Sequence, residues 1–263
     1  MIHHTADGNA VYYRVQGAGR ELLIVHCAAG DADVYPELVK TLSSHFRCVT
    51  FDRPGYHRSE QLDRDTTVAE QVMAIWTVQQ QVPADRVWVF AHSGGGNYAL
   101  AYALAHPERV KGLILVEPAL YAIFPVQERP PEIDRMQRVV LPLFQQGKIT
   151  QGRAEFFAMF GWSTDEPASE NWGFFGHELA VITRWCPSEA DLHQVTLPVL
   201  ILAGEKSPPL LQNISRRLAA HLGNARLILL EKIGHQSLWT EPQLIAAKIT
   251  AFIDETEARA QKA

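Results

Sequence analysis

Short apolar segments, rich in β-branched residues, alternate with helix-like segments along most of this 263-residue chain. Helical patterns are clearest over residues 66–81, 95–106, 209–222 and 241–257. The apolar segments between them read AVYYRVQG, ELLIVHC, RCVTFD, RVWVFAH, VKGLILVE, PVLILAG and ARLILLE. Strands that alternate with helices usually pair in parallel. The chain is therefore expected to be an α/β protein, with a mostly parallel twisted sheet covered by helices on both faces.

The alternation stops between residues 119 and 197, where several helices and no strand are expected. This segment holds 11 of the 24 aromatic residues of the chain. We predict a core domain made of residues 1–118 and 198–263, with a helical cap of residues 119–197 inserted in it. Part of the aromatic side chains would pack on one another, and the rest would cover an apolar pocket. By size, the expected wall residues are Trp162, Trp172 and Trp185.

Charge and composition exclude several classes of partner. The formal net charge is −5, and no run of basic residues is longer than the pair Arg216–Arg217. This predicts neither a nucleic-acid partner nor a membrane partner. No signal peptide or 18-residue apolar stretch is recognisable, so a cytoplasmic location is expected. The three cysteines are scattered, which favours reduced thiols. The sequence gives no indication of the oligomeric state.

The strongest chemical signal lies in VWVFAHSGGGNYALAYALAH, where a strand, a tight turn and a helix meet. The turn has the small-x-Ser-x-Gly pattern of a nucleophile elbow, centred on Ser93. A serine held in such a strained turn brings neighbouring backbone so close that only Gly or Ala fits two residues before and after it. Ala91 and Gly95 meet this demand, and the following helix adds a positive dipole. Ser93 is therefore the predicted nucleophile.

With this turn, the chain resembles the α/β-hydrolase fold family over nearly its whole length. The segment IVHCAAGDAD resembles the oxyanion loop of the family, with Cys27 where glycine is usual, and FDRPGYHRS resembles its Asp-x-x-Gly-x-x-x-Ser turn. The resemblance implies that the backbone N–H groups of Ala28 and Gly94 form an oxyanion hole. It also implies that Asp52 and Arg53 hold the turn. We interpret Cys27 as a small buried thiol rather than a reactive one.

A serine nucleophile needs a base, and His235 is the predicted one. It follows the last apolar strand, at the same edge of the expected sheet as Ser93. The side chain of His92 should leave the elbow in another direction, and His26 is interpreted as a hydrogen-bonding prop of the oxyanion loop. No H-x-x-x-H or C-x-x-C spacing occurs, so neither a metal nor another cofactor is expected.

The acid that orients the base is less obvious. Members of the family commonly supply it after the strand equivalent to PVLILAG, where this chain has Ser207, with Glu205 two residues earlier. Glu117 instead ends VKGLILVE, at the edge where open α/β sheets gather their active sites. This is similar to zearalenone-type lactonases, which take the acid from the strand that follows the nucleophile's helix. Glu117 is the predicted acid, and Glu205 or no functioning acid stay open as alternatives.

Serine, imidazole and an oxyanion hole together imply acyl transfer. We predict a serine hydrolase that cleaves a carboxylic ester or lactone through an acyl-enzyme, with an apolar or aromatic small-molecule substrate. Two alternatives stay open. One is an enzyme of different chemistry on the same fold, such as a cofactor-free dioxygenase, a lyase or a C–C hydrolase. The other is a ligand-binding receptor with little turnover.

Overall fold

The computed structural model describes residues 1–163 and 169–262, and these contain one eight-stranded sheet in the order β1-β2-β4-β3-β5-β6-β7-β8. Only the pairs β1–β2 and β2–β4 are antiparallel, and the other neighbours are parallel. The predicted mostly parallel sheet is confirmed. The strands are β1 (Ile2–His4), β2 (Ala10–Gln16), β3 (Arg20–Val25), β4 (Phe46–Phe51), β5 (Val87–His92), β6 (Val110–Val116), β7 (Val199–Gly204) and β8 (Ala225–Leu230).

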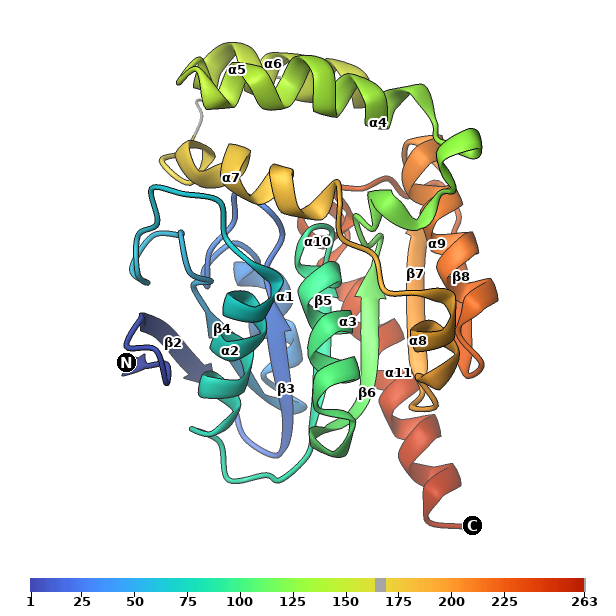
Figure 1. Ribbon diagram of the computed structural model, residues 1–263. Coiled ribbons are helices and arrows are strands. Elements are labelled where there is room, and N and C mark those ends of the chain that lie inside the picture. The colour runs from blue at the N-terminus through green and yellow to red at the C-terminus, as the bar shows by residue number, and fades with distance from the viewer. Residues whose placement is uncertain (164–168, 263) are drawn as a thin grey trace.

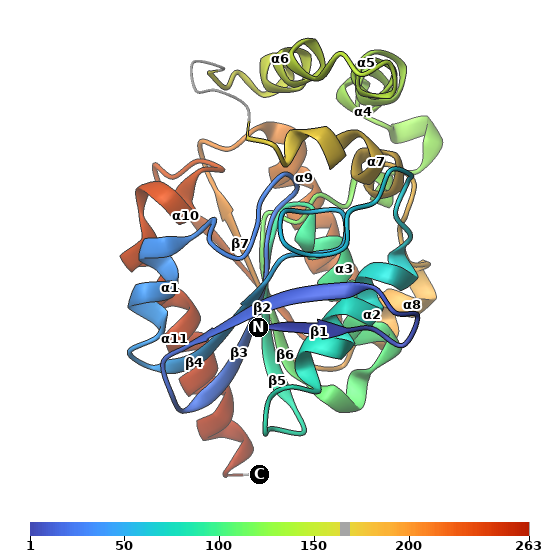
Figure 2. The ribbon, with the colours of Figure 1, turned by 90° about the vertical axis from the view of Figure 1, so that its left-hand side faces the viewer.

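Helices cover both faces of the sheet, as predicted (Figures 1 and 2). One face carries α1 (Pro36–Leu42), α10 (Ser237–Thr240) and α11 (Pro242–Ala260). The other carries α2 (Val68–Gln79), α3 (Gly95–Ala105) and α9 (Pro209–His221), with α8 (Glu189–Gln194) beside α9. The four clearest helical patterns of the sequence correspond to α2, α3, α9 and α11. Among the described helices, none is long and apolar enough to cross a membrane.

The central strands are apolar throughout because both of their faces are buried. On β5, Val89 and Ala91 belong to the hydrophobic core under α2, α3 and α9, whereas Trp88 and Phe90 belong to the core under α1 and α11. Successive side chains of a strand point to opposite faces, so each strand contributes to both cores. The arrangement leaves the carboxyl ends of the parallel strands as the edge where polar side chains can gather.

The chain between β6 and β7 contains helices and turns, and no strand among its described residues. Figure 1 shows α4, α5 and α6 as an upper layer, with α7 between that layer and the carboxyl ends of the strands. These helices therefore stand over the edge at which Ser93 and Glu117 follow their strands. The bounds are η2 (Tyr121–Ile123), η3 (Val126–Glu128), α4 (Pro131–Arg135), the π-helix η4 (Met136–Val140), α5 (Leu141–Gln145), α6 (Ile149–Phe160) and α7 (Trp172–Ile182), while η1 (Pro107–Arg109) precedes β6.

Candidate active site

Ser93 occupies a strained turn between β5 and α3. Its φ of 50° lies in the left-handed region, which is unfavourable for a residue with a side chain and is typically kept at functional sites. A Cβ on Gly95 would lie 2.3 Å from the carbonyl oxygen of His26, so only glycine fits there. The strand, the strained serine and the glycine expected from the sequence are thus present together. They place Ser93 at the carboxyl edge of the sheet.

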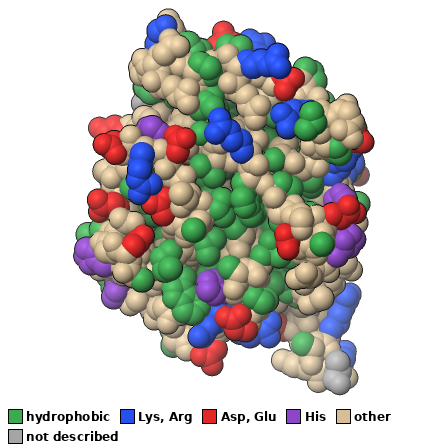
Figure 3. Space-filling model, viewed as in Figure 1, with side chains coloured by type: hydrophobic (Ala, Val, Ile, Leu, Met, Phe, Trp, Pro, Cys, Tyr) green, Lys and Arg blue, Asp and Glu red, His purple; other side chains and the backbone are tan. Residues whose placement is uncertain are grey.

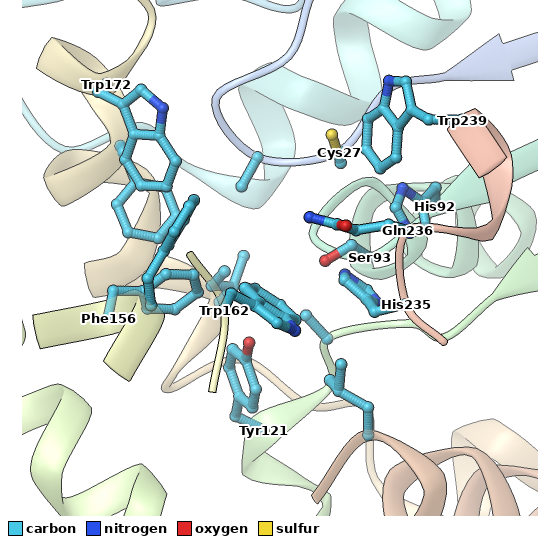
Figure 4. Close-up of a pocket in the computed structure, with 16 residues that line it drawn as sticks. Cys27, His92, Ser93, Tyr121, Phe156, Trp162, Trp172, His235, Gln236 and Trp239 are labelled. Carbon is cyan, nitrogen blue, oxygen red and sulfur yellow. The ribbon is translucent and has the colours of Figure 1, made fainter. Parts of the chain in front are cut away.

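Glu117 and His235 form a hydrogen-bonded pair at the same edge. Glu117 comes directly after β6 and is buried, and its Oε2 atom lies 2.5 Å from Nδ1 of His235. Its Oε1 atom accepts a hydrogen bond from the N–H of Gly204 at 2.8 Å. Since Nδ1 donates to a carboxylate, the free Nε2 of His235 is the atom that can accept a proton. Figure 4 shows His235 next to Ser93, both facing the same cavity.

The surroundings of Glu117 keep it ionised. Burial alone would raise its pKa, but the hydrogen bond and charge of His235 act in the opposite direction, as do the Ser207 hydroxyl and the Gly204 N–H. Together they hold the pKa of the Glu117 carboxyl below its ordinary value. Glu117 is thus a carboxylate at neutral pH, and it can stabilise a positive charge on His235.

The two alternative positions for the acid have other surroundings. Glu205 is exposed, and its carboxylate accepts a hydrogen bond from the N–H of Lys232. Ser207 is buried near Glu117, and its side chain carries no charge. Of the two glutamates considered from the sequence, it is therefore Glu117 that the structure brings to His235.

The loop after β3 leaves the backbone N–H group of Ala28 without a partner among the described residues. The N–H groups of Cys27 and Ala29 donate to the hydroxyls of Tyr35 and Tyr56, at 3.0 and 3.2 Å. Within the described parts of the chain, the N–H groups of Ala28 and Gly94 have no acceptor. A Cβ on Gly94 would lie 3.3 Å from the nitrogen of Ala28, so the two residues are neighbours. Two free donors beside Ser93 are what an oxyanion hole requires.

Two histidines near the site are neutral and hydrogen-bonded. His26 contacts the carbonyl oxygen of Cys27 through Nδ1 at 2.7 Å and accepts the N–H of Arg53 at Nε2. His92 contacts the hydroxyl of Tyr35 through Nδ1 at 2.9 Å, while its ring also lies along the cavity wall. Burial holds the pKa of both imidazoles well below the ordinary value. Through these hydrogen bonds His26 supports the loop after β3, as interpreted from the sequence.

The cavity over Ser93 has a volume of about 130 Å³ and a mainly aromatic and aliphatic wall. The ring of Trp162 lies parallel to that of His235, with ring centroids 5.0 Å apart and planes 4° apart. Among the described lining residues there is no Lys, Arg, Asp or Glu. The lining residues are Cys27, Ala28, His92, Ser93, Ala119, Tyr121, Phe156, Phe157, Trp162, Trp172, Phe175, Ile182, Leu211, His235, Gln236 and Trp239.

The structure corrects one of the three expected wall residues. Trp162 and Trp172 line the cavity, but Trp185 does not. It follows the end of α7 and lines a shallow groove on the outer surface with residues of α2 and α3. Figure 3 shows hydrophobic side chains gathered over these two helices. Conversely, Gln236 and Trp239 line the cavity, although neither was expected from the sequence. The sequence feature that could have indicated them is their position within four residues of His235.

One group of metal-binding side chain types occurs in the described residues, and it lies away from the cavity. Glu189 and His193 of α8 face His221 at the end of α9, with Nδ1 of His221 3.4 Å from Oε1 of Glu189. Glu189 and His193 are exposed to solvent. None of the three contributes to the cavity over Ser93.

The sequence is similar to known hydrolases. A family model described as alpha/beta hydrolase fold matches residues 21–160. A pimeloyl-[acyl-carrier protein] methyl ester esterase of Pectobacterium atrosepticum is 28% identical, over 92% of this chain and 98% of the relative. A 2-hydroxy-6-oxononadienedioate/2-hydroxy-6-oxononatrienedioate hydrolase of Cupriavidus pinatubonensis is 22% identical, over 90% of this chain and 88% of the relative.

The structure is also similar to that of a solved esterase from Exiguobacterium antarcticum. The TM-score is 0.80, with 20% sequence identity over 97% of this chain and 99% of the other. At this identity the similarity concerns the fold. It covers nearly the whole length of both chains.

Proposed function

The chain belongs to the α/β-hydrolase fold family, and from this premise we propose that it is a serine hydrolase cleaving an uncharged carboxylic ester or lactone through an acyl-enzyme. The observation that carries the proposal is the 2.5 Å hydrogen bond between Glu117 and His235 beside Ser93. An imidazole whose Nδ1–H is held by a carboxylate has its Nε2 free to take the proton of a serine hydroxyl.

The proposed reaction has two halves. In the first, His235 takes the proton of Ser93 while Oγ attacks the carbonyl carbon, and the N–H groups of Ala28 and Gly94 stabilise the oxyanion. His235 then donates its proton to the departing alkoxide, which leaves an acyl-enzyme. In the second half, His235 takes a proton from water while the oxygen of that water attacks the acyl carbon. The bond from the acyl carbon to Ser93 Oγ then breaks, the carboxylic acid leaves, and His235 returns the proton to Oγ. Glu117 keeps its charge throughout and stabilises the imidazolium.

The wall of the cavity supports an apolar substrate. Its aromatic and aliphatic side chains can bury hydrocarbon, and the described lining residues include no Lys, Arg, Asp or Glu. A volume of about 130 Å³ suits a small acyl or alcohol group. We infer that the part of the substrate inside the cavity is small, apolar and uncharged.

We also propose that residues 119–197 act as a cap on a core of residues 1–118 and 198–263. Phe156 on α6 and Trp172 on α7 line the cavity from above, and Ser93 lines it from the sheet. A cavity bounded by both parts of the chain excludes water from the reacting atoms when a substrate fills it.

A second candidate function is the hydrolysis of a carbon–carbon bond. It arises because the Cupriavidus relative is named as a hydrolase of a dienedioate. Such a substrate carries two carboxylates, and the described lining residues include no Lys or Arg that could pair with them. The absence of a cationic partner in this wall favours the uncharged ester or lactone.

A substrate panel combined with active-site labelling tests the proposal. The wild type is expected to hydrolyse p-nitrophenyl esters or lactones faster than a dienedioate. A fluorophosphonate probe is expected to label the wild type with one group per chain and to leave Ser93→Ala unlabelled. Labelling that persists in Ser93→Ala would contradict the assignment of the nucleophile. Turnover of the dienedioate alone would favour the second candidate.

A further inference from the structure

A fully buried ion pair joins α7 to the loop that carries Ala28. Arg53 follows β4 and Glu178 lies on α7, and both side chains are 0% exposed. Nη2 of Arg53 lies 2.8 Å from Oε1 of Glu178. The other carboxylate oxygen, Oε2, accepts a hydrogen bond from the hydroxyl of Tyr56. Burying two charges is costly unless both are well paired. The other contacts of these two side chains therefore indicate what the ion pair does in the protein.

Both partners of Glu178 also hold the backbone on either side of Ala28. Arg53 donates from Nη2 to the carbonyl oxygen of Cys27 at 3.1 Å, and the Tyr56 hydroxyl accepts the N–H of Ala29 at 3.2 Å. The peptide unit between Cys27 and Ala28 is planar and trans, so the N–H of Ala28 points opposite to the Cys27 carbonyl. Fixing that carbonyl toward Arg53 therefore fixes the direction of the Ala28 N–H.

The carboxylate of Glu178 also lies close to the second donor of the site. A Cβ on Gly94 would be 3.3 Å from Oε1 of Glu178 and 3.3 Å from the nitrogen of Ala28. An unpaired negative charge at this point would oppose the formation of an oxyanion. The guanidinium of Arg53 offsets that charge, so Glu178 can hold the loop without this cost.

We propose that Glu178 is a positioning residue, which fixes the direction of the Ala28 N–H in the oxyanion hole through Arg53 and Tyr56. The proposal rests on the proposed acyl transfer at Ser93. Glu178 is not among the residues that line the cavity, but Trp172 and Phe175 of the same helix are. The helix that contacts the substrate thus also sets a donor for the transition state.

The test compares an oxygen ester with its thionoester on the wild type and on Glu178→Gln. Sulfur is a weak hydrogen-bond acceptor, so p-nitrophenyl butyrate depends on the oxyanion hole more than its thiono analogue does. Losing one oxyanion donor costs about 10²–10³ in kcat, and misdirecting one should cost part of this, about ten- to hundredfold. We expect Glu178→Gln to lower kcat for the oxygen ester by that factor, with KM changed by less than about threefold. The preference for the oxygen ester should shrink in parallel.

Two further variants separate positioning from folding. Tyr56→Phe keeps the ion pair and frees the Ala29 N–H, and it should shift the oxygen-to-thiono ratio in the same direction by a smaller factor. Leu179→Ala removes a buried side chain next to Glu178 that does not line the cavity, so it should lower Tm and keep the ratio. An unchanged ratio in both Glu178→Gln and Tyr56→Phe would overturn the proposal. An equal fall in Leu179→Ala would overturn it too.

Ser93→Ala distinguishes failure of this inference from failure of the proposed function. If Ser93→Ala hydrolysed the ester as fast as the wild type, acyl transfer at Ser93 would be wrong, and the role of Glu178 with it. If Ser93→Ala were inactive while Glu178→Gln matched the wild type in rate and ratio, only the role of Glu178 would be wrong.

Discussion

Glu117 and His235 lie 118 positions apart in the chain, and yet a carboxylate oxygen of one is 2.5 Å from Nδ1 of the other. The sheet order explains the approach. β6 pairs in parallel with β5, so Glu117 and Ser93 follow neighbouring strands at the same edge. β7 is the next strand, and Ser207 in the loop after it stands close to the same carboxylate. Glu117 thus reaches His235 from the strand beside the one that leads to Ser93.

The first prediction concerns this acid. Glu117→Gln keeps the size of the side chain and removes the charge that orients and stabilises the His235 imidazolium. We expect the variant to fold and its kcat to fall by roughly 10³–10⁴, the loss known when such an orienting acid is neutralised. Steady-state kinetics on a p-nitrophenyl ester, with circular dichroism as a check of folding, measure the effect.

Two matched variants make the first prediction specific. Glu205→Gln removes an exposed carboxylate of the adjacent loop and should leave kcat within about twofold of the wild type. Adding Ser207→Asp to Glu117→Gln restores a carboxylate close to the lost one and should recover part of the rate. Near-normal activity in Glu117→Gln together with a collapse in Glu205→Gln would place the acid after β7.

The second prediction concerns pH. The pKa of Glu117 is lowered in the folded protein from its ordinary value of 4.5. A carboxyl whose pKa is lowered by folding stabilises the protein above its unfolded pKa, and this contribution is lost as the pH falls through the folded pKa. The free energy of unfolding of the wild type minus that of Glu117→Gln should therefore shrink as the pH falls below about 4.5.

Urea denaturation of both proteins at a series of pH values between 7 and 3 measures this difference. Other carboxyl groups titrate alike in the two proteins, so their contributions cancel in the subtraction. A difference that stayed constant, or grew, toward pH 3 would mean that Glu117 is not held ionised by its partners.

Ser93 and Glu117 could be singled out from the sequence as the candidate nucleophile and acid because each is tied to a local pattern. Ser93 sits between an apolar strand and a helix with the small residues that the turn needs, and Glu117 ends an otherwise apolar strand. Trp185 shows the limit of this reasoning. Aromatic enrichment predicts that a segment covers a pocket, but it does not say which side chain faces inward where a helix ends.

The contact between Arg53 and Glu178 had no local signal at all. Glu178 lies on α7, far along the chain from Arg53, and its neighbours in sequence are those of an ordinary apolar helix. The pairing depends on how α7 packs over the carboxyl ends of the strands. This packing is a property of the folded protein and not of the local sequence. Whether a charged side chain is buried can be told only once the residues that pack around it are known.

The third prediction concerns Cys27, which stands where the family resemblance implies a glycine. Burial is the main cause that raises the pKa of its thiol to about 11. Because the thiolate is the reactive form, Cys27 should be alkylated by iodoacetamide at pH 8 much more slowly than a free cysteine. Mass spectrometry of the modified peptide measures the rate, and Cys27→Ala should retain ester hydrolysis. Rapid alkylation of Cys27 with loss of activity in the wild type would instead assign it a chemical role.

The last prediction concerns the size of the cavity. Across p-nitrophenyl esters of increasing acyl length, kcat/KM should rise about fourfold per methylene, since burying one is worth about 0.8 kcal/mol, until the cavity is full. Trp162→Ala removes an indole from the wall, so the most reactive ester should have a longer chain than it has for the wild type. Trp185→Ala is the matched control, because Trp185 lines the outer groove and should leave the optimum unchanged. A flat series in the wild type, or the same optimum in all three proteins, would show that the acyl chain does not enter this cavity.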